Sequence, residues 1–233
     1  MKLYDAIIAE TMDCARAQNA RRLRLSSPWP DNGSAELVMT RDAAFELGGS
    51  GRKSANFTCV TASPGIAENE VILCGPDLPA IRGDVSFARI AILRVGDIGE
   101  DEKAYDAIRA MEFAKYHVYP KGYMVRVSSQ SFEERVRVSR EAVKKGVDFA
   151  RIGEAYIRKY LEVPGVEKVR IVFFADCDKA VEALAKQAGK VDAITKTLTH
   201  ILDGLPTDCG HCAMKPVCDE VEGMRELHFG QKK

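Results

Sequence analysis

The spacing of hydrophobic positions changes along the chain, and each change predicts a different kind of element. Apolar residues at helical spacing predict a helix over residues 3–19. Between residues 35 and 95, short apolar runs bounded by glycine, proline, asparagine or aspartate predict strands instead. We expect these strands at residues 36–40, 44–47, 56–60, 70–74 and 87–95. The last run is the longest and the most apolar, so we place it centrally in a sheet.

The second half of the chain mixes both kinds of element. Strands are predicted at residues 123–127 and 169–176, and helices at residues 101–116, 131–145, 149–161, 178–188 and 191–203. The helix over residues 131–145 is supported by Glu133 with Arg137 and Glu141 with Lys145, two pairs of opposite charge at i,i+4 spacing. Because helices and strands are mixed without an internal repeat, the pattern predicts an α/β (α+β) fold, a mixed β-sheet flanked by helices.

Loop-forming residues divide the chain into three parts. Residues 1–33 are expected to form a helix and a loop, residues 34–204 an α/β body, and residues 205–233 a small C-terminal cysteine module. The first loop holds the only tryptophan, Trp29, between two prolines. Such a tryptophan either pins the loop onto the core or contacts a partner, and we favour the first interpretation.

Composition narrows the classes of function. The 34 basic and 34 acidic residues balance, so nothing in the charge favours nucleic-acid binding. No apolar run approaches the roughly 20 residues that a membrane span needs. Asp5 lies where a signal peptide would begin its apolar core. The seven cysteines are an odd number and do not form a disulfide framework. We therefore expect a cytoplasmic protein with no nucleic acid partner and no membrane span.

The most specialised chemistry lies near the C-terminus, where Cys209, Cys212 and Cys218 form a C-x2-C-x5-C run. Thiolates at this spacing can point at one centre. A [4Fe–4S] cluster normally takes four thiolates, so these three would need a fourth ligand. We prefer Cys177, which follows a predicted strand. The remaining cysteines, Cys14, Cys59 and Cys74, are alternatives, although we expect the last two to be buried and inert.

Three other interpretations of this run stay open. Structural zinc would add a histidine such as His211, His200 or His228 to the three cysteines. The tetrapeptide Cys-Gly-His-Cys also occurs in thiol–disulfide oxidoreductases, but there it follows a strand and begins a helix, whereas here it follows a predicted helix. Three free cysteines without a role would be liable to oxidation.

A glycine-rich turn suggests a separate anion site. Gly48 and Gly49 begin a turn that resembles a phosphate-binding loop, but Arg52 separates the last glycine from Lys53, and a strand follows rather than a helix. A hairpin turn is the simpler interpretation. Its backbone N–H groups could still hold an anion such as coenzyme A, together with Arg126 and Arg140.

Several short runs of the body carry a resemblance to a known family. They are residues 45–49, 75–78, 87–95, 126–128, 149–153, 163–169 and 173–176. In order and approximate spacing over residues 45–178, they resemble the beta subunit of the CO dehydrogenase/acetyl-CoA synthase complex. In that family this region is the α/β domain that precedes the domain with the catalytic metal centre.

The resemblance implies a place in one-carbon metabolism of an anaerobe. The family joins a methyl group, CO and coenzyme A on nickel bridged to a [4Fe–4S] cluster, and it uses a Cys-Gly-Cys run for nickel. No such run occurs in this sequence, so we expect an iron–sulfur accessory or electron-transfer component rather than a complete synthase. Its expected partners are subunits of such a complex, and homo-oligomers. The alternatives are a scaffold with structural zinc and an enzyme that binds coenzyme A or another anion.

Overall fold

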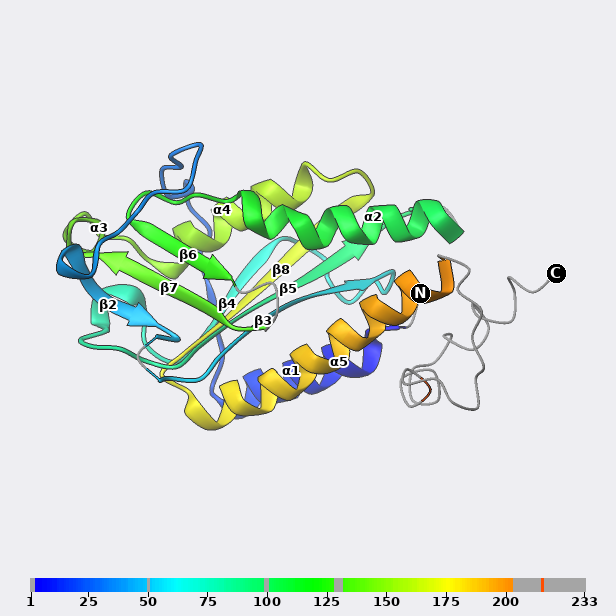
Figure 1. Ribbon diagram of the computed structural model, residues 1–233, viewed down its shortest axis with the longest axis horizontal. Coiled ribbons are helices and arrows are strands. Elements are labelled where there is room, and N and C mark those ends of the chain that lie inside the picture. Colours follow the sequence, from blue (N-terminus) through cyan, green and yellow to red (C-terminus); the bar gives the residue numbers. More distant parts are fainter. Residues whose placement is uncertain (1–2, 50, 99–100, 128–131, 203–214, 216–233) are drawn as a thin grey trace.

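A computed structural model describes residues 3–49, 51–98, 101–127, 132–202 and 215. It confirms the predicted α/β class, because helices flank mixed β-structure (Figure 1). The helices are α1 (Asp5–Ala17), α2 (Asp101–Ala114), α3 (Arg140–Lys144), α4 (Phe149–Leu161) and α5 (Asp178–Leu202), with short 3-10 turns η1 (Thr40–Asp42), η2 (Leu78–Ala80) and η3 (Lys115–His117). The strands are β1 (Arg21–Leu23), β2 (Ala43–Leu47), β3 (Ser54–Thr61), β4 (Glu70–Cys74), β5 (Phe87–Val95), β6 (Tyr123–Val127), β7 (Glu134–Ser139) and β8 (Val166–Ala175).

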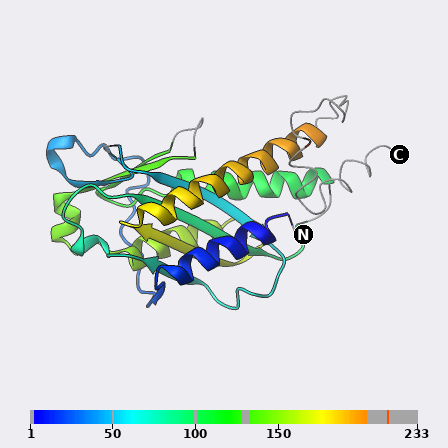
Figure 2. The ribbon, with the colours of Figure 1, turned by 90° about the horizontal axis from the view of Figure 1, so that it is seen from below.

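The larger sheet is mixed and has the order β1-β4-β8-β5-β3. Strand β5 runs antiparallel to β8 and parallel to β3, while β4 runs parallel to β8. Helices α1 and α5 lie on one face of this sheet and α4 lies on the other (Figures 1 and 2). Helix α2 contacts β3, α4 and α5. This double cover explains why eight of the nine residues of β5 are buried, as its apolar sequence predicts.

A smaller antiparallel sheet has the order β2-β7-β6. The chain entering β7 covers the outer edge of the larger sheet, since the Asn56 N–H donates to Phe132 O at 2.8 Å. All eight residues of β3 are buried, although β3 is an edge strand. Covering an edge in this way protects it from pairing with another chain.

The helix predicted over residues 131–145 is wrong in its first half. Residues Glu134–Ser139 form β7, in which Glu134, Val136 and Val138 alternate as buried positions. Arg137 pairs with Glu46 of β2 and not with Glu133. The i,i+4 pair of Glu141 and Lys145 does form, at the short helix α3.

Three further elements differ from the sequence prediction. No strand forms at residues 36–40, where the backbone Val38 N–H instead contacts the Met124 sulfur at 3.3 Å. The short β1 was missed, because three residues carry too little pattern. The two helices predicted over residues 178–203 are one helix, α5, because the single Gly189 does not interrupt it.

Trp29 confirms the expectation that it pins its loop to the core. Its side chain is 5% exposed, and its indole N–H donates to Lys121 O at 2.8 Å. The Arg151 guanidinium lies 4.4 Å from the ring centroid, in cation–π geometry. The tryptophan therefore ties the N-terminal loop to α4 and to the turn before β6.

Candidate functional site

The three cysteines of the C-x2-C-x5-C run, Cys209, Cys212 and Cys218, lie outside the described residues. Within the part of the chain that the structure describes, no group of three or more histidine, cysteine or acidic side chains is arranged to hold a metal ion. The predicted metal site therefore stays a prediction for these three residues, and the structure bears on it through Cys177.

Cys177 lies between the end of β8 and the start of α5, half-buried, with its thiol 3.3 Å from Ala175 O. Helix α5 has 25 residues and so spans about 37 Å. Cys209 follows its last residue, Leu202, by seven positions, which bridge at most about 25 Å. Within one chain, even a fully extended segment running back along α5 would leave the Cα atoms of Cys209 and Cys177 about 12 Å apart. This geometry disfavours Cys177 as the ligand that completes a centre containing Cys209.

Two other cysteines gather around Cys177. Cys74 ends β4, and its thiol lies 3.9 Å from Ala15 O, next to Cys14 on α1. Burial, followed by the nearby Cys177 and Cys14, raises the pKa of Cys74 to about 12. Burial also raises the pKa of Cys177, and Asp176 and Cys14 raise it further. Three of the four described cysteines thus lie within electrostatic reach of one another.

The fourth described cysteine, Cys59, is buried inside β3, as the sequence analysis expected. Burial raises its pKa well above the ordinary value, and the charge of Glu112 raises it further. A thiol that stays protonated is a poor nucleophile and a poor metal ligand. Cys59 therefore behaves as a small apolar core residue.

Two residues of the predicted anion site, Gly49 and Arg126, both lie against the carboxylate of Glu46. A Cβ added at Gly49 would overlap the Glu46 side chain. The same carboxylate pairs with Arg137 at 2.6 Å and with Arg126 at 3.4 Å. Glu46 thus occupies the position that an anion bound to the glycine turn and Arg126 would take.

Arg140 lies apart from this group. It follows Ser139, which pairs with Ala43 at the opposite end of β2 from Gly48. Its guanidinium donates to Arg41 O. The structure therefore brings Gly48, Gly49 and Arg126 together and leaves Arg140 out.

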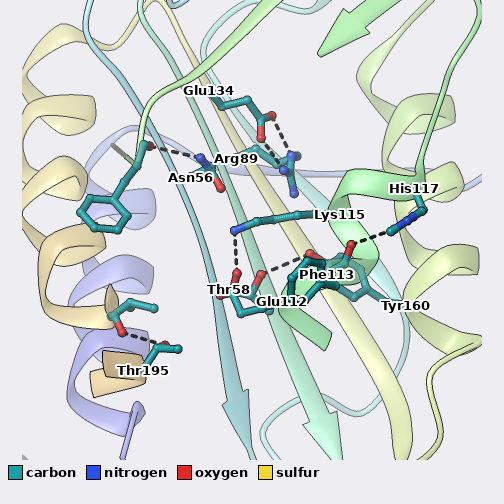
Figure 3. Close-up of polar contacts among 12 residues, drawn as sticks. Asn56, Thr58, Arg89, Glu112, Phe113, Lys115, His117, Glu134, Tyr160 and Thr195 are labelled. Atoms are coloured by element: carbon teal, nitrogen blue, oxygen red, sulfur yellow. Dashed lines mark hydrogen bonds and ion pairs between the residues drawn. The ribbon is translucent and has the colours of Figure 1, made fainter. Parts of the chain in front are cut away.

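Sequence reasoning missed a buried polar network between the two sheets (Figure 3). Arg89 of β5 and Glu134 of β7 are both fully buried and share two hydrogen bonds, one of them 2.8 Å from Arg89 Nε to Glu134 Oε1. Burial alone would lower the pKa of Arg89, but the Glu134 carboxylate and the phenols of Tyr156 and Tyr160 raise it well above its usual value. Arg89 is therefore charged, and its guanidinium lies 4.2 Å from the Tyr156 ring centroid.

The network continues along β3 towards α2. The Thr58 hydroxyl lies 3.2 Å from the Tyr160 hydroxyl, and the Lys115 ammonium donates to Glu112 at 2.6 Å (Figure 3). Lys115 is 7% exposed. Each buried cation therefore has its own carboxylate, which is the condition under which buried charges are tolerated.

One sequence signal could have revealed this network. Arg89 occupies the middle of a strand whose neighbours are almost all apolar, so its charge must meet a partner inside the protein. Glu134 could not be recognised as that partner from the sequence, because the i,i+4 charge pairs of its segment predict a helix.

A family model described as CO dehydrogenase/acetyl-CoA synthase complex beta subunit matches residues 33–180. The chain belongs to this family. The matched region runs from the segment before β2 through both β6–β7 and β8 to the start of α5, and it contains the resemblance expected over residues 45–178. No curated protein matches the chain.

Some of the candidate site residues lie inside the region that the family model matches, and others lie after it. Arg89, Glu134 and the glycine turn lie inside the matched region, whereas Cys209, Cys212 and Cys218 follow it. Among the helices that the structure describes, none is long and apolar enough to cross a membrane.

Proposed function

We propose that this member of the CO dehydrogenase/acetyl-CoA synthase beta subunit family is an iron–sulfur accessory or electron-transfer component of CO and acetyl-CoA metabolism. The observation that carries the proposal is the C-x2-C-x5-C run of Cys209, Cys212 and Cys218, which follows a body that belongs to the family. Thiolates are the ligands that iron–sulfur clusters take in proteins.

The three cysteines would hold a [4Fe–4S] cluster, and such a cluster supplies one-electron transfer. The fourth ligand would come from a residue other than Cys177, since α5 separates Cys177 from the motif. A partner subunit could supply it, and the proposed partners are subunits of a CO dehydrogenase/acetyl-CoA synthase-like complex in the cytoplasm. The sequence contains no Cys-Gly-Cys run, so no nickel chemistry is assigned to these residues.

Anaerobic purification followed by iron, sulfide and zinc analysis tests the proposal. We expect a brown protein with broad visible absorption and about four irons per chain. A colourless protein that stays free of iron after reconstitution would contradict it. One zinc per chain without iron would instead identify the structural zinc scaffold.

Two matched variants then locate the ligands. Cys212→Ser should lose most of the bound metal, because it removes one thiolate of the C-x2-C pair. Cys177→Ser should keep the metal content of the parent protein, because α5 places this residue too far from Cys209. A loss of metal in Cys177→Ser alone would show that the motif is not the site.

A further inference from the structure

We propose that Cys14, Cys74 and Cys177 form a separate redox site, in which Cys177 forms a disulfide with one of the other two when the protein meets a small-molecule disulfide. The inference does not rest on the proposed metal centre, because none of the three belongs to the C-x2-C-x5-C run. All three are free thiols in the structure.

The fold brings three separate elements together at this site. Strands β4 and β8 run parallel, so both end at the same edge of the sheet, β4 at Cys74 and β8 at Ala175. Cys177 follows β8 by two residues. Helix α1 packs against this edge, where Ala15 O lies 3.9 Å from the Cys74 thiol. The parallel pairing of β4 with β8 and the position of α1 therefore bring Cys14, Cys74 and Cys177 into one region of the fold.

Gly75 permits a close approach between the ends of these strands. It adopts φ +90°, and a Cβ there would overlap Ala175 O and lie 3.3 Å from the Cys177 sulfur. Any larger residue would clash with the Ala175 carbonyl and force the ends of β4 and β8 apart. The absence of a side chain at position 75 leaves Cys177 against the residue that follows Cys74.

The three thiols differ in their access to solvent. Cys14 and Cys177 are half-buried, so a small oxidant can reach them from solvent, whereas Cys74 is fully buried. The Arg21 guanidinium donates to Gly75 O at 3.0 Å and places a positive charge beside the group. Arg21 lowers the pKa of Cys74, but burial raises it by more, and burial and Asp176 raise the pKa of Cys177, so the thiolate that attacks a disulfide becomes more abundant as the pH rises.

With oxidised glutathione as the oxidant, the exchange proceeds in two steps. The Cys177 thiolate attacks one glutathione sulfur, which forms a mixed disulfide and releases one glutathione thiolate that takes up a proton. A neighbouring thiol, Cys14 or Cys74, loses its proton and attacks the Cys177 sulfur, which releases the second glutathione. Two protein thiols thus lose two electrons and two protons, and oxidised glutathione gains them.

The experiment uses the full chain with Cys209, Cys212 and Cys218 replaced by serine, so that the C-terminal thiols cannot take part. The protein is incubated with excess oxidised glutathione, alkylated and digested after glutamate. This digestion separates Cys59 from Cys74, because Glu68 and Glu70 lie between them. We expect mass spectrometry to find Cys177 linked to the peptide of Cys14 or of Cys74, and Cys59 alkylated as a free thiol.

Two variants control the assignment. Cys59→Ser should form the same link to Cys177, and Cys177→Ser should keep all its remaining body thiols free. The proposal is overturned if Cys177 stays a free thiol or carries only glutathione, or if Cys177→Ser still loses two thiols. Mapping the unsubstituted chain in the same way answers the question if the serine variants do not fold. This result does not depend on whether Cys209, Cys212 and Cys218 bind a metal, so the two proposals can fail separately.

Discussion

Arg89 and Glu134 show at the residue scale how the two sheets depend on each other. Each charge is removed from water, and each is neutralised by a residue of the other sheet. The desolvation of both groups is offset only while both are present. The pair is therefore a requirement for the sheets to pack as they do, rather than a source of surplus stability.

Glu134→Ala should lower the free energy of unfolding by about 3–5 kcal/mol, because it leaves the Arg89 charge buried without a partner. The neighbouring Glu133→Ala is the control, since Glu133 pairs with Arg135 at the surface, where both side chains are about half exposed. That change should stay within about 1 kcal/mol. Urea denaturation of the two variants measures the difference, and equal losses would contradict a special role for the buried pair.

A double variant separates charge from packing. Arg89→Met with Glu134→Leu should recover most of the stability lost in Glu134→Ala, because apolar side chains of similar size remove the desolvation penalty on both sides. A double variant that is no more stable than Glu134→Ala would contradict this account, because removing the unpaired charge would then recover nothing.

At the scale of elements, the helices and strands with one clear period were predictable and the ambiguous ones were not. Helix α4 and strand β5 have the bounds that their patterns predict. The segment of β7 carries Glu133 and Arg137 at a helical spacing, but it also alternates Glu134, Val136 and Val138, so local sequence fits both structures. Pairing with β2 and β6 decides in favour of the strand, and that information lies far away in the sequence.

Two helical glycines give opposite expectations. Gly153 of α4 lies against Val71 of β4, where an added Cβ would lie 2.4 Å from Val71 Cγ2. Gly153→Ala should therefore destabilise the protein by about 1–3 kcal/mol through overpacking. Gly189 of α5 has open space around its Cβ position. Gly189→Ala should stabilise the protein by up to about 1 kcal/mol through helix propensity. Thermal denaturation compares them, and shifts of the same sign would refute this account of α4 packing.

At the scale of the whole molecule, buried phenols set an upper pH limit on stability. Burial raises the pKa values of Tyr4, Tyr123, Tyr156 and Tyr160 above that of an exposed tyrosine. Between the unfolded pKa of about 10 and these higher values, the folded protein binds more protons than the unfolded chain. The tyrosine contribution is therefore fully present below pH 10 and decreases as the pH rises further.

Urea denaturation between pH 8 and pH 11 should show this decrease beginning near pH 10. Tyr4→Phe should make it less steep, because it removes one of the titrating groups. An unchanged slope in Tyr4→Phe would contradict the assignment.

The candidate sites also differ in how much of each can be predicted from the sequence. The spacing of Cys209, Cys212 and Cys218 is a local signal that needs no fold. The meeting of Cys14, Cys74 and Cys177 depends on a parallel pairing and on a helix laid across its end, and no local pattern contains either. For the predicted anion site, the sequence did not show that the Glu46 side chain would lie against both Gly49 and Arg126.

The position of β8 has a consequence for the order in which the protein forms. This strand is followed in the described chain by α5, yet it lies between β4 and β5 in the middle of the larger sheet. Until Val166–Ala175 has left the ribosome, β1–β4 and β5–β3 are two separate strand pairs with no hydrogen bonds to join them. A nascent chain that ends before Val166 has apolar strands without a completed sheet, and such exposed apolar surface favours aggregation. Folding is then a late, concerted event governed by contacts between distant parts of the sequence.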